Sequence, residues 1–359
     1  LTPGPLTTTD TVKQVMLFDH CTWDDDYKQI TQTIRRTLLA LGHVSEPEYT
    51  AVLMQGSGTF GVESVLSGVI SSTDKVLVLQ NGAYSKRMVE MCDYHGIKYV
   101  VYEEDYAHVP DPAIVEDVLK SDGNITHISM VHSETTSGLL NDIAAIGELA
   151  KKYNKKFIVD AMSSFGGVDI NVPELGITYL VSSANKCIQG VPGFSFIIAK
   201  ISDLKQTKGI ARSLSLDLYA QWETMEKDGG KWRFTSPTHV VAAFSQALKE
   251  LAAEGGITAR NARYTATNRA LRKGMEELGF KAYIDEAHQG PIITTFFYPE
   301  NCKFTFGKMY AYLKDHGYVI YPGKLTDAET FRLGNIGEIY MDDVEKILGI
   351  FKDFVSAEN

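Results

Sequence analysis

The stretch Leu180-Val-Ser-Ser-Ala-Asn-Lys-Cys-Ile-Gln-Gly-Val-Pro-Gly193 carries a single lysine, Lys186, in a polar and glycine-rich loop. The residues before it, from Ile177 to Ser182, have the length and composition of a buried strand. A lysine in such a loop is ordinarily solvated, and the residue alone would indicate no function. Its position directly after a strand makes Lys186 a candidate amine nucleophile.

A second apolar run, Lys156-Phe-Ile-Val-Asp160, also ends in one charged side chain. The run is typical of a strand that is buried on both faces. A carboxylate at its end needs a partner, because burying an unpaired charge is unfavourable. Asp160 either caps the following turn or pairs with a cationic ligand, and the residue alone does not decide between the two.

A third stretch, Met54-Gln-Gly-Ser-Gly-Thr-Phe-Gly61, is a glycine-rich turn between a strand pattern and a helix pattern. Free N–H groups at a helix N-terminus, together with the hydroxyls of Ser57 and Thr59, can bind phosphate. A tight turn that needs glycine for its backbone angles is the structural alternative. The G-x-G-x-x-G spacing also matches a dinucleotide site, which requires an acid about 20 residues further on. The second strand runs instead into Gln80-Asn81-Gly82, so the dinucleotide reading is disfavoured.

From about residue 51 to 199, apolar runs of strand length alternate with helical patterns. This alternation predicts an α/β fold with a seven-stranded, mostly parallel sheet. The sixth and seventh strands are joined by a loop without a helix, so the seventh should be antiparallel. Ligands bind at the carboxyl ends of such strands, where Asp160, Lys186 and the glycine-rich turn all lie. The predicted strands are Ala51–Met54, Lys75–Leu79, Lys98–Tyr102, His127–Val131, Lys156–Val159, Tyr179–Ser182 and Phe194–Ala199. The predicted helices are Val62–Ile70, Ser85–His95, Pro112–Leu119 and Ile143–Tyr153.

A turn that binds phosphate, an acid at one strand end and a lysine at another are the groups that a pyridoxal phosphate enzyme needs. In such enzymes the lysine forms an imine with the cofactor and the acid pairs with its pyridinium nitrogen. Because the topology brings these three segments together, a shared cofactor site is favoured over a solvated lysine, a turn-capping aspartate and a tight glycine turn that are unrelated to one another.

The pattern changes near residue 237, which predicts a second, smaller unit. We expect an N-terminal arm plus a large cofactor-binding domain over residues 1–254 and a small α+β domain over residues 255–359. The predicted elements of the later part are helices at Pro237–Glu254, Ala259–Leu278, Phe306–His316 and Met341–Val355, and strands at Pro291–Tyr298, Tyr318–Tyr321 and Thr330–Leu333.

Composition excludes several classes of protein. The net charge of −10 over 359 residues argues against a nucleic-acid partner, which requires a basic face. No apolar run approaches the roughly 20 residues of a membrane span, and the first residues show no signal-peptide pattern. The four cysteines are scattered, which favours a cytoplasmic location and neither a disulfide framework nor a metal site.

Other candidates remain open from the sequence alone. Tyr84 follows the second strand and can stack on a flat ring or belong to the core. Arg332 lies in a strand-like run and is either an exposed strand arginine or a bidentate clamp for an anion. Residues 1–27 are expected to be turn-rich, and the polar run Asp19–Tyr27 is expected to be a solvated loop, with folding over a ligand site as the alternative.

Longer strings resemble fold-type I pyridoxal phosphate enzymes, specifically the class V aminotransferases related to alanine–glyoxylate aminotransferase. Within these, the chain looks like the 2-aminoethylphosphonate–pyruvate transaminases over almost its whole length. The strings that carry the resemblance are Leu1-Thr-Pro-Gly-Pro-Leu6, Cys21-Thr-Trp-Asp-Asp-Asp-Tyr27, Val131-His-Ser-Glu-Thr-Thr136, Val159-Asp-Ala-Met-Ser-Ser-Phe-Gly-Gly167, Ser182-Ser-Ala-Asn-Lys-Cys-Ile-Gln-Gly-Val-Pro-Gly-Phe194, Arg212-Ser-Leu-Ser-Leu-Asp-Leu-Tyr-Ala-Gln-Trp222 and Lys231-Trp-Arg-Phe-Thr-Ser-Pro-Thr-His239.

The resemblance implies a role for each matching position. Lys186 is the imine-forming lysine, Asp160 pairs with the ring nitrogen, and Arg332 binds the anionic group of the substrate. Tyr84 takes the place of a ring-stacking residue that is tryptophan in related transaminases. The other implied cofactor contacts are Ser57, Gly58 and Thr59 at the phosphate, Thr135 at the ring hydroxyl, Asn185 beside the cofactor, and Thr235 at the phosphate of the other subunit's cofactor.

The implied reaction is ping-pong: 2-aminoethylphosphonate gives phosphonoacetaldehyde, and pyruvate then gives L-alanine. The implied assembly is a homodimer with shared active sites. One arginine is insufficient for a phosphonate, so Arg212, Arg233 or the Asp19–Tyr27 loop is a candidate second contact. The alternative function is an alanine–glyoxylate or serine–pyruvate aminotransferase on the same frame.

Overall fold

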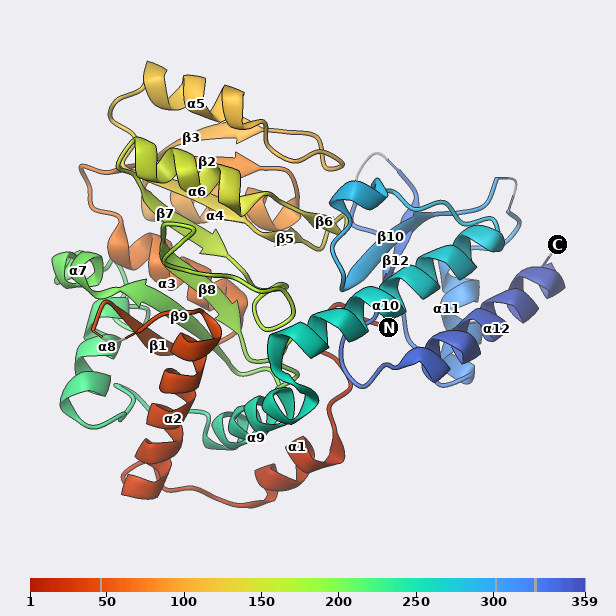
Figure 1. Ribbon diagram of the computed structural model, residues 1–359, viewed down its shortest axis with the longest axis horizontal. Coiled ribbons are helices and arrows are strands. Elements are labelled where there is room, and N and C mark those ends of the chain that lie inside the picture. The colour runs from red at the N-terminus through yellow and green to blue at the C-terminus, as the bar shows by residue number, and fades with distance from the viewer. Residues whose placement is uncertain (46, 301, 326–327, 359) are drawn as a thin grey trace.

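A seven-stranded sheet forms the centre of the larger lobe (Figure 1). The structure, a computed structural model, describes residues 1–45, 47–300, 302–325 and 328–358. The strand order is β1-β9-β8-β7-β4-β2-β3, and β9 runs antiparallel to both of its neighbours while the other pairs are parallel. The predicted seven strands and the antiparallel seventh are therefore confirmed. Their bounds are β1 Tyr49–Gln55, β2 Lys75–Gln80, β3 Lys98–Glu103, β4 His127–Val131, β7 Lys156–Asp160, β8 Ile177–Ser183 and β9 Phe194–Lys200.

The central strands β4, β7 and β8 are apolar because layers of helices bury both faces of the sheet. Two helices of this lobe, α2 and α8, lie where the sequence pattern predicted none. A short hairpin of β5 (Ser133–Glu134) and β6 (Leu139–Leu140) follows β4. The helices are α2 Asp25–Leu41, α3 Gly58–Val69, α4 Ala83–His95, α5 Pro112–Ser121, α6 Ile143–Lys152, α7 Ile201–Leu204, α8 Leu218–Lys227 and α9 Thr238–Glu254.

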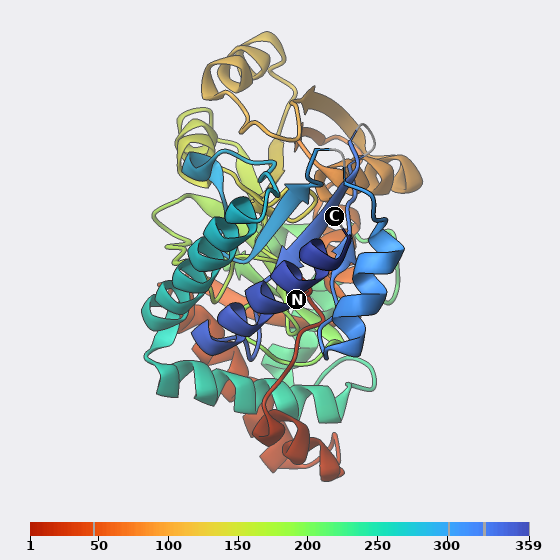
Figure 2. The same cartoon turned by 90° about the vertical axis from the view of Figure 1, so that its right-hand side faces the viewer.

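The smaller lobe has a three-stranded antiparallel sheet in the order β10-β12-β11 and its own hydrophobic core (Figures 1 and 2). Its elements are α10 Gly256–Glu277, β10 Ile293–Phe297, α11 Phe306–Asp315, β11 Tyr321–Pro322, β12 Thr330–Gly334 and α12 Met341–Glu358. The predicted strand at Tyr318–Tyr321 is wrong in extent, because the N–H of Tyr318 closes the end of α11 on the carbonyl of Leu313. The division near residue 255 stays a prediction, since α10 contributes to the contacts of both lobes.

The N-terminal segment runs between the lobes (Figure 2). Leu1 belongs to the core of the smaller lobe, and its carbonyl accepts a hydrogen bond from the N–H of Gly334 at 3.0 Å. A side chain at Gly334 would lie 2.4 Å from the carbonyl oxygen of Thr2, so the two backbones approach too closely for a Cβ atom. This contact positions the first residues over the carboxyl ends of the central strands.

Residues 1–27 are more helical than predicted. Helix α1 spans Asp10–Gln14, capped by Thr9, and is followed by the 3₁₀ turn Val15–Leu17. Helix α2 already starts at Asp25, because the acidic run favours a helix N-terminus. In the described part of the chain, no helix is long and apolar enough to cross a bilayer.

Candidate active site

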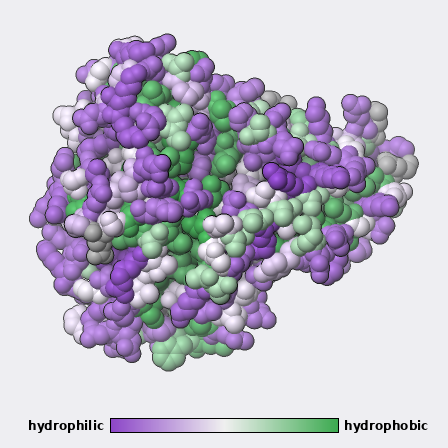
Figure 3. Space-filling view, in the orientation of Figure 1, coloured by the Kyte–Doolittle hydropathy of each residue, from purple (hydrophilic) through white to green (hydrophobic). Residues whose placement is uncertain are grey.

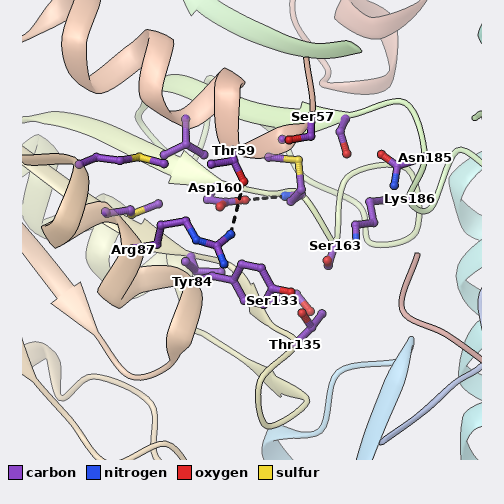
Figure 4. Close-up of a pocket in the computed structure, with 17 residues that line it drawn as sticks. Ser57, Thr59, Tyr84, Arg87, Ser133, Thr135, Asp160, Ser163, Asn185 and Lys186 are labelled. Carbon is purple, nitrogen blue, oxygen red and sulfur yellow. Dashed lines mark hydrogen bonds between the residues drawn. The ribbon is translucent and has the colours of Figure 1, made fainter. Parts of the chain in front are cut away.

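A cavity of about 190 Å³ lies at the carboxyl ends of β4, β7 and β8 and beside the N-terminus of α3 (Figure 4). The parallel strands bring together segments that lie far apart in the sequence. Eight predicted site residues line this cavity: Ser57, Gly58, Thr59, Tyr84, Thr135, Asp160, Asn185 and Lys186.

Lys186 follows β8, and its amine donates a hydrogen bond to the carbonyl of Pro3 at 2.8 Å. Helix α10 holds the loop from the other side, because Arg260 and Tyr264 both donate to the carbonyl of Cys187, at 2.6 and 3.2 Å. Burial lowers the pKa of the Lys186 ammonium, although Tyr84 opposes that shift. The N-terminal segment and α10 therefore fix the Lys186 amine at the wall of the cavity.

Asp160 ends β7 and is buried in the wall of the cavity. Its carboxylate accepts a hydrogen bond from the N–H of Met162 at 2.9 Å. Burial raises the pKa of Asp160 to about 7, while the Met162 N–H and the charges of Lys186 and Arg87 work in the opposite direction. A cationic ligand group beside this carboxylate would stabilise its ionised form.

The N-terminus of α3 supplies an anion-binding end. Ser57 occupies the N-cap position in an extended conformation, and its side chain makes no capping hydrogen bond. Gly56 has a φ of +97°, which favours glycine and aims the turn toward the cavity. The first N–H groups of α3 have no partner within the helix, and its dipole favours negative charge there.

Tyr84 lies in the first turn of α4. Two cationic side chains contact its ring, one from each lobe. The guanidinium of Arg87 lies 5.0 Å and the ammonium of Lys324 lies 4.6 Å from the ring centroid. Lys324 also donates a hydrogen bond to the Tyr84 hydroxyl at 3.2 Å. Burial works against ionisation of Tyr84, but the charges of Lys324 and Lys186 outweigh it and lower the pKa of the phenol.

Arg332 is predicted to bind the substrate but is not among the residues that line the cavity. It is only 2% exposed, and its guanidinium donates to the carbonyls of Thr135 and Pro322, both at 3.0 Å. The reading of Arg332 as an exposed strand arginine is therefore wrong. Its guanidinium lies directly behind Thr135, which does line the cavity.

Thr235 lies outside the cavity and is exposed, and its carbonyl accepts a hydrogen bond from the Gln55 amide. The suggested second phosphonate contacts do not line the cavity either. Arg212 donates to the carbonyl of Ile70 at the end of α3, and Arg233 donates to the carbonyl of Leu214. In the Asp19–Tyr27 run, Asp19 bonds His239 and Tyr27 is buried against Ser236.

Several lining residues were missed from the sequence, among them Arg87, Ser133, Met162, Ser163 and Ser183. Arg87 was detectable in principle, because it lies three residues after Tyr84 and therefore on the same helix face. Its guanidinium donates to the Thr59 hydroxyl at 3.3 Å and so links α4 to the first turn of α3 (Figure 4). Ser133 belongs to a run of hydroxyl residues that ends the fourth predicted strand, which turn formation explains equally well.

The cavity fits pyridoxal phosphate. An anion-binding helix end, a buried carboxylate, a buried amine and an aromatic ring surround one space (Figure 4). The hydroxyls of Ser133 and Ser183 line it and are buried without a hydrogen-bond partner among the described residues, so they have free capacity for a polar ligand. A cavity of about 150 Å³ already holds a benzene ring.

Comparison with known proteins agrees with this geometry. A family model described as "Aminotransferase class-V" matches residues 21–321. The chain is 56% identical, over its full length and 98% of the relative, to a 2-aminoethylphosphonate–pyruvate transaminase of Lysinibacillus sphaericus (strain C3-41). It is 55% identical, over 97% of its length and 95% of the relative, to the protein of the same name from Klebsiella pneumoniae subsp. pneumoniae.

Solved structures support the fold. The ureidoglycine–glyoxylate aminotransferase of Bacillus subtilis superimposes with a TM-score of 0.91 at 22% identity, over 100% of this chain and 93% of that chain. The pyridoxamine–pyruvate aminotransferase of Mesorhizobium loti gives 0.90 at 23% identity, over 99% and 92% of the two chains. The predicted fold-type I architecture is thus confirmed, and the chain belongs to the class V aminotransferase family.

Proposed function

We propose that this chain is a pyridoxal phosphate-dependent transaminase that transfers the amino group of 2-aminoethylphosphonate to pyruvate. The products are phosphonoacetaldehyde and L-alanine. The observation that carries the proposal is the identity of 54–56% over almost the whole chain to relatives of that name, together with a cavity that holds the lysine and the carboxylate this chemistry needs. The alternative alanine–glyoxylate function is not favoured by these relatives.

Bound pyridoxal phosphate supplies an electron sink for the negative charge that develops at the substrate carbon. With the cofactor bound, Lys186 would hold it covalently. Once released, its amine would take the proton from the substrate carbon that bears the amino group and deliver it to the cofactor. Burial lowers the pKa of its ammonium, which favours the neutral amine that a base requires. Asp160 holds the proton on the ring nitrogen, and its burial makes that ion pair strong.

The remaining cofactor contacts are proposals of the same kind. Ser57, Gly58 and Thr59 bind the phosphate at the start of α3, and Arg87 reinforces that end through Thr59. Tyr84 packs on one face of the ring, Thr135 contacts the ring hydroxyl, and Asn185 supports the cofactor beside Lys186. Each of these residues lines the cavity.

Arg332 is proposed to bind the anionic group of both substrates. Its guanidinium is preorganised by two backbone carbonyls and lies behind Thr135. Arg332→Ala should raise the KM for 2-aminoethylphosphonate and for pyruvate. A response of only one substrate would contradict the shared clamp.

We further propose a homodimer in which Thr235 reaches the cofactor phosphate of the other subunit. Thr235 is exposed and does not line the cavity of its own chain. Figure 3 shows a hydrophobic patch at the lower edge of the molecule, over the segment between α1 and α2. The exposed large hydrophobic residues of this lobe include Leu17, Phe18, Trp23, Phe60, Leu214 and Phe234, a set that a partner subunit would cover.

A complementation experiment tests the shared site. Lys186→Ala and Thr235→Ala proteins are each expected to be weak or inactive. After the two are mixed and allowed to exchange subunits, half of the sites in a hybrid dimer combine an intact lysine with an intact threonine. Recovered activity supports the proposal, and a strictly monomeric protein by sedimentation contradicts it.

The reaction itself is tested on the purified protein. Borohydride reduction followed by peptide mapping should mark Lys186, and alanine should form from 2-aminoethylphosphonate and pyruvate on the same sample. Glyoxylate as the acceptor and serine as the donor are assayed in place of these substrates. Faster turnover with either one would favour the alternative aminotransferase function. A cytoplasmic location stays a prediction from the scattered cysteines.

A further inference from the structure

Lys324 is a cation of the smaller lobe that contacts Tyr84, a residue that lines the cavity. It follows β11, whereas Tyr84 and Thr135 belong to the larger lobe. Its ammonium lies 4.6 Å from the centroid of the Tyr84 ring and donates to the Tyr84 hydroxyl at 3.2 Å. This partner is a phenol, so the contact fixes the ammonium without providing it with a full opposite charge.

Arg332 approaches the same place from β12. Its guanidinium donates to the Thr135 carbonyl at 3.0 Å. Burial lowers the pKa of Arg332, and Tyr84 beside it works against that shift, so Tyr84 is a common neighbour of both cations. Figure 4 shows Tyr84 and Thr135 together on one side of the cavity, with Ser57 and Asn185 on the other. Two positive groups of the smaller lobe therefore lie behind Tyr84 and Thr135, on the side of the cavity opposite the N-terminus of α3.

The two substrates of the proposed reaction differ in charge. At pH 8 a phosphonate is a dianion, because its second pKa resembles that of a phosphate monoester, about 6. The carboxylate of pyruvate carries one charge. A single arginine matches a carboxylate, whereas a dianion gains from a second cation, which the position of Lys324 can supply.

We propose that Lys324 is a specificity-determining residue, an inference that rests on the proposed function. With Arg332 it forms a site of two cations that binds the dianionic phosphonate. Arg332 binds the anionic group of either substrate. Lys324 interacts with the second negative charge, which only the phosphonate carries. The Tyr84 hydroxyl holds the ammonium in position before the substrate enters. Lys324 is exposed, so it exchanges this neutral partner for the phosphonate without breaking a buried ion pair.

The test compares Lys324→Met with the wild type. Methionine keeps the length of the side chain and removes the charge. The second-order constant kcat/KM is measured for 2-aminoethylphosphonate and for pyruvate separately, because each reports its own half-reaction. We expect about a tenfold or greater loss for the phosphonate, as for a charge-assisted hydrogen bond, and less than about threefold for pyruvate. Lys324→Arg should keep most of the preference, and Lys352→Met, on the exposed side of α12, serves as the control.

A second measurement isolates the charge from the shape. 2-Aminoethylsulfonate has the same tetrahedral form with one charge fewer, and it is offered as a competitive inhibitor. Its inhibition constant should be nearly the same in the wild type and in Lys324→Met. The preference for the phosphonate over the sulfonate should therefore be smaller in the variant. Retained cofactor absorbance and an unchanged melting temperature show that the variant is folded.

Equal losses for both substrates, an equal loss for the sulfonate, or no loss at all would overturn the assignment of Lys324. A wild-type protein that does not use 2-aminoethylphosphonate is a different result. It would refute the proposed function before any variant is measured, so the two failures are distinguishable.

Discussion

Strand β7 and the β5 hairpin each place a buried carboxyl group near the cavity, but the two groups have different surroundings. Asp160 is 6% and Glu134 is 0% exposed. Burial raises the pKa of both. Asp160 lines the cavity, whereas Glu134 lies behind it, among hydrogen-bond donors of α4 and of its own turn.

Glu134 is satisfied by the protein. It accepts hydrogen bonds from the N–H groups of Ser85 and Thr136, both at 3.3 Å, and from the Thr136 hydroxyl at 2.7 Å. It thus caps the first turn of α4, where the N-cap residue Gly82 has no side chain. A Cβ atom on Gly82 would lie 2.1 Å from the Glu134 side chain, so only glycine leaves room for it. Burial alone therefore does not identify a catalytic acid; free bonding capacity toward a cavity does.

The largest expected effect concerns Asp160. Asp160→Asn should lower the rate of alanine formation by about 10²- to 10³-fold, because a neutral amide cannot pair with a protonated ring nitrogen. The amide oxygen can still accept the Met162 N–H, so the free energy of unfolding should change little below about pH 4, where the folded protein keeps Asp160 protonated. Steady-state kinetics and urea unfolding measure the two quantities. Activity within tenfold of the wild type would remove Asp160 from its proposed role.

The pH dependence of apoprotein stability is the second test. Burial raises the pKa of Asp160 from 3.8 to about 7. Between these values the folded protein keeps a proton that the unfolded chain has lost, so the stabilisation is complete below about pH 4 and is lost as the pH rises to about 7. The free energy of unfolding should fall over this window, by on the order of 4 kcal/mol for this group. Glu134 contributes a slope of the same sign in both proteins, so Asp160→Asn should flatten the curve; parallel curves would contradict this account.

A smaller effect is expected at Glu134, and mainly on stability. Glu134→Ala leaves two buried N–H groups unpaired and should lower the free energy of unfolding by about 2 kcal/mol. Glu134→Gln keeps an acceptor and should lose less. Denaturant unfolding measures both, with Glu148→Ala on the exposed face of α6 as the control. A loss no larger than that of the control would show that α4 does not depend on this cap.

The smallest effect is expected at Ser85. Its hydroxyl donates to Glu134 at 3.4 Å and to the carbonyl of Gly82 at 3.1 Å. Ser85→Ala keeps the backbone N–H contact to Glu134 but removes the hydroxyl oxygen that accepts the Asn81 N–H at 3.1 Å, so the free energy of unfolding should fall by about 1 kcal/mol. The rate of alanine formation should stay within threefold. A larger loss of rate than of stability would mean that Glu134 acts on the chemistry through α4.

The periodicity of the sequence was sufficient to predict the large sheet and the strand ends that meet at the cavity. In a parallel sheet the carboxyl ends share one edge, so Asp160, Lys186 and the glycine-rich turn could be grouped without any knowledge of distances. Helices α2 and α8 were missed. Helix α2 follows an acidic, turn-like run, and its strongly polar face gave a weaker apolar pattern than the central strands.

The sequence by itself determined the fold class and the strand ends that carry Asp160 and Lys186, because local burial patterns are encoded in neighbouring residues. The resemblance to known enzymes added Thr135 and Asn185, and eight of the 17 residues that line the cavity were predicted in all. Only the tertiary structure brought Pro3 to Lys186, placed Arg87 beside Thr59, and set Lys324 on Tyr84. These contacts join segments from different lobes or elements. Their distances depend on the path of the whole chain, and no local periodicity contains that information.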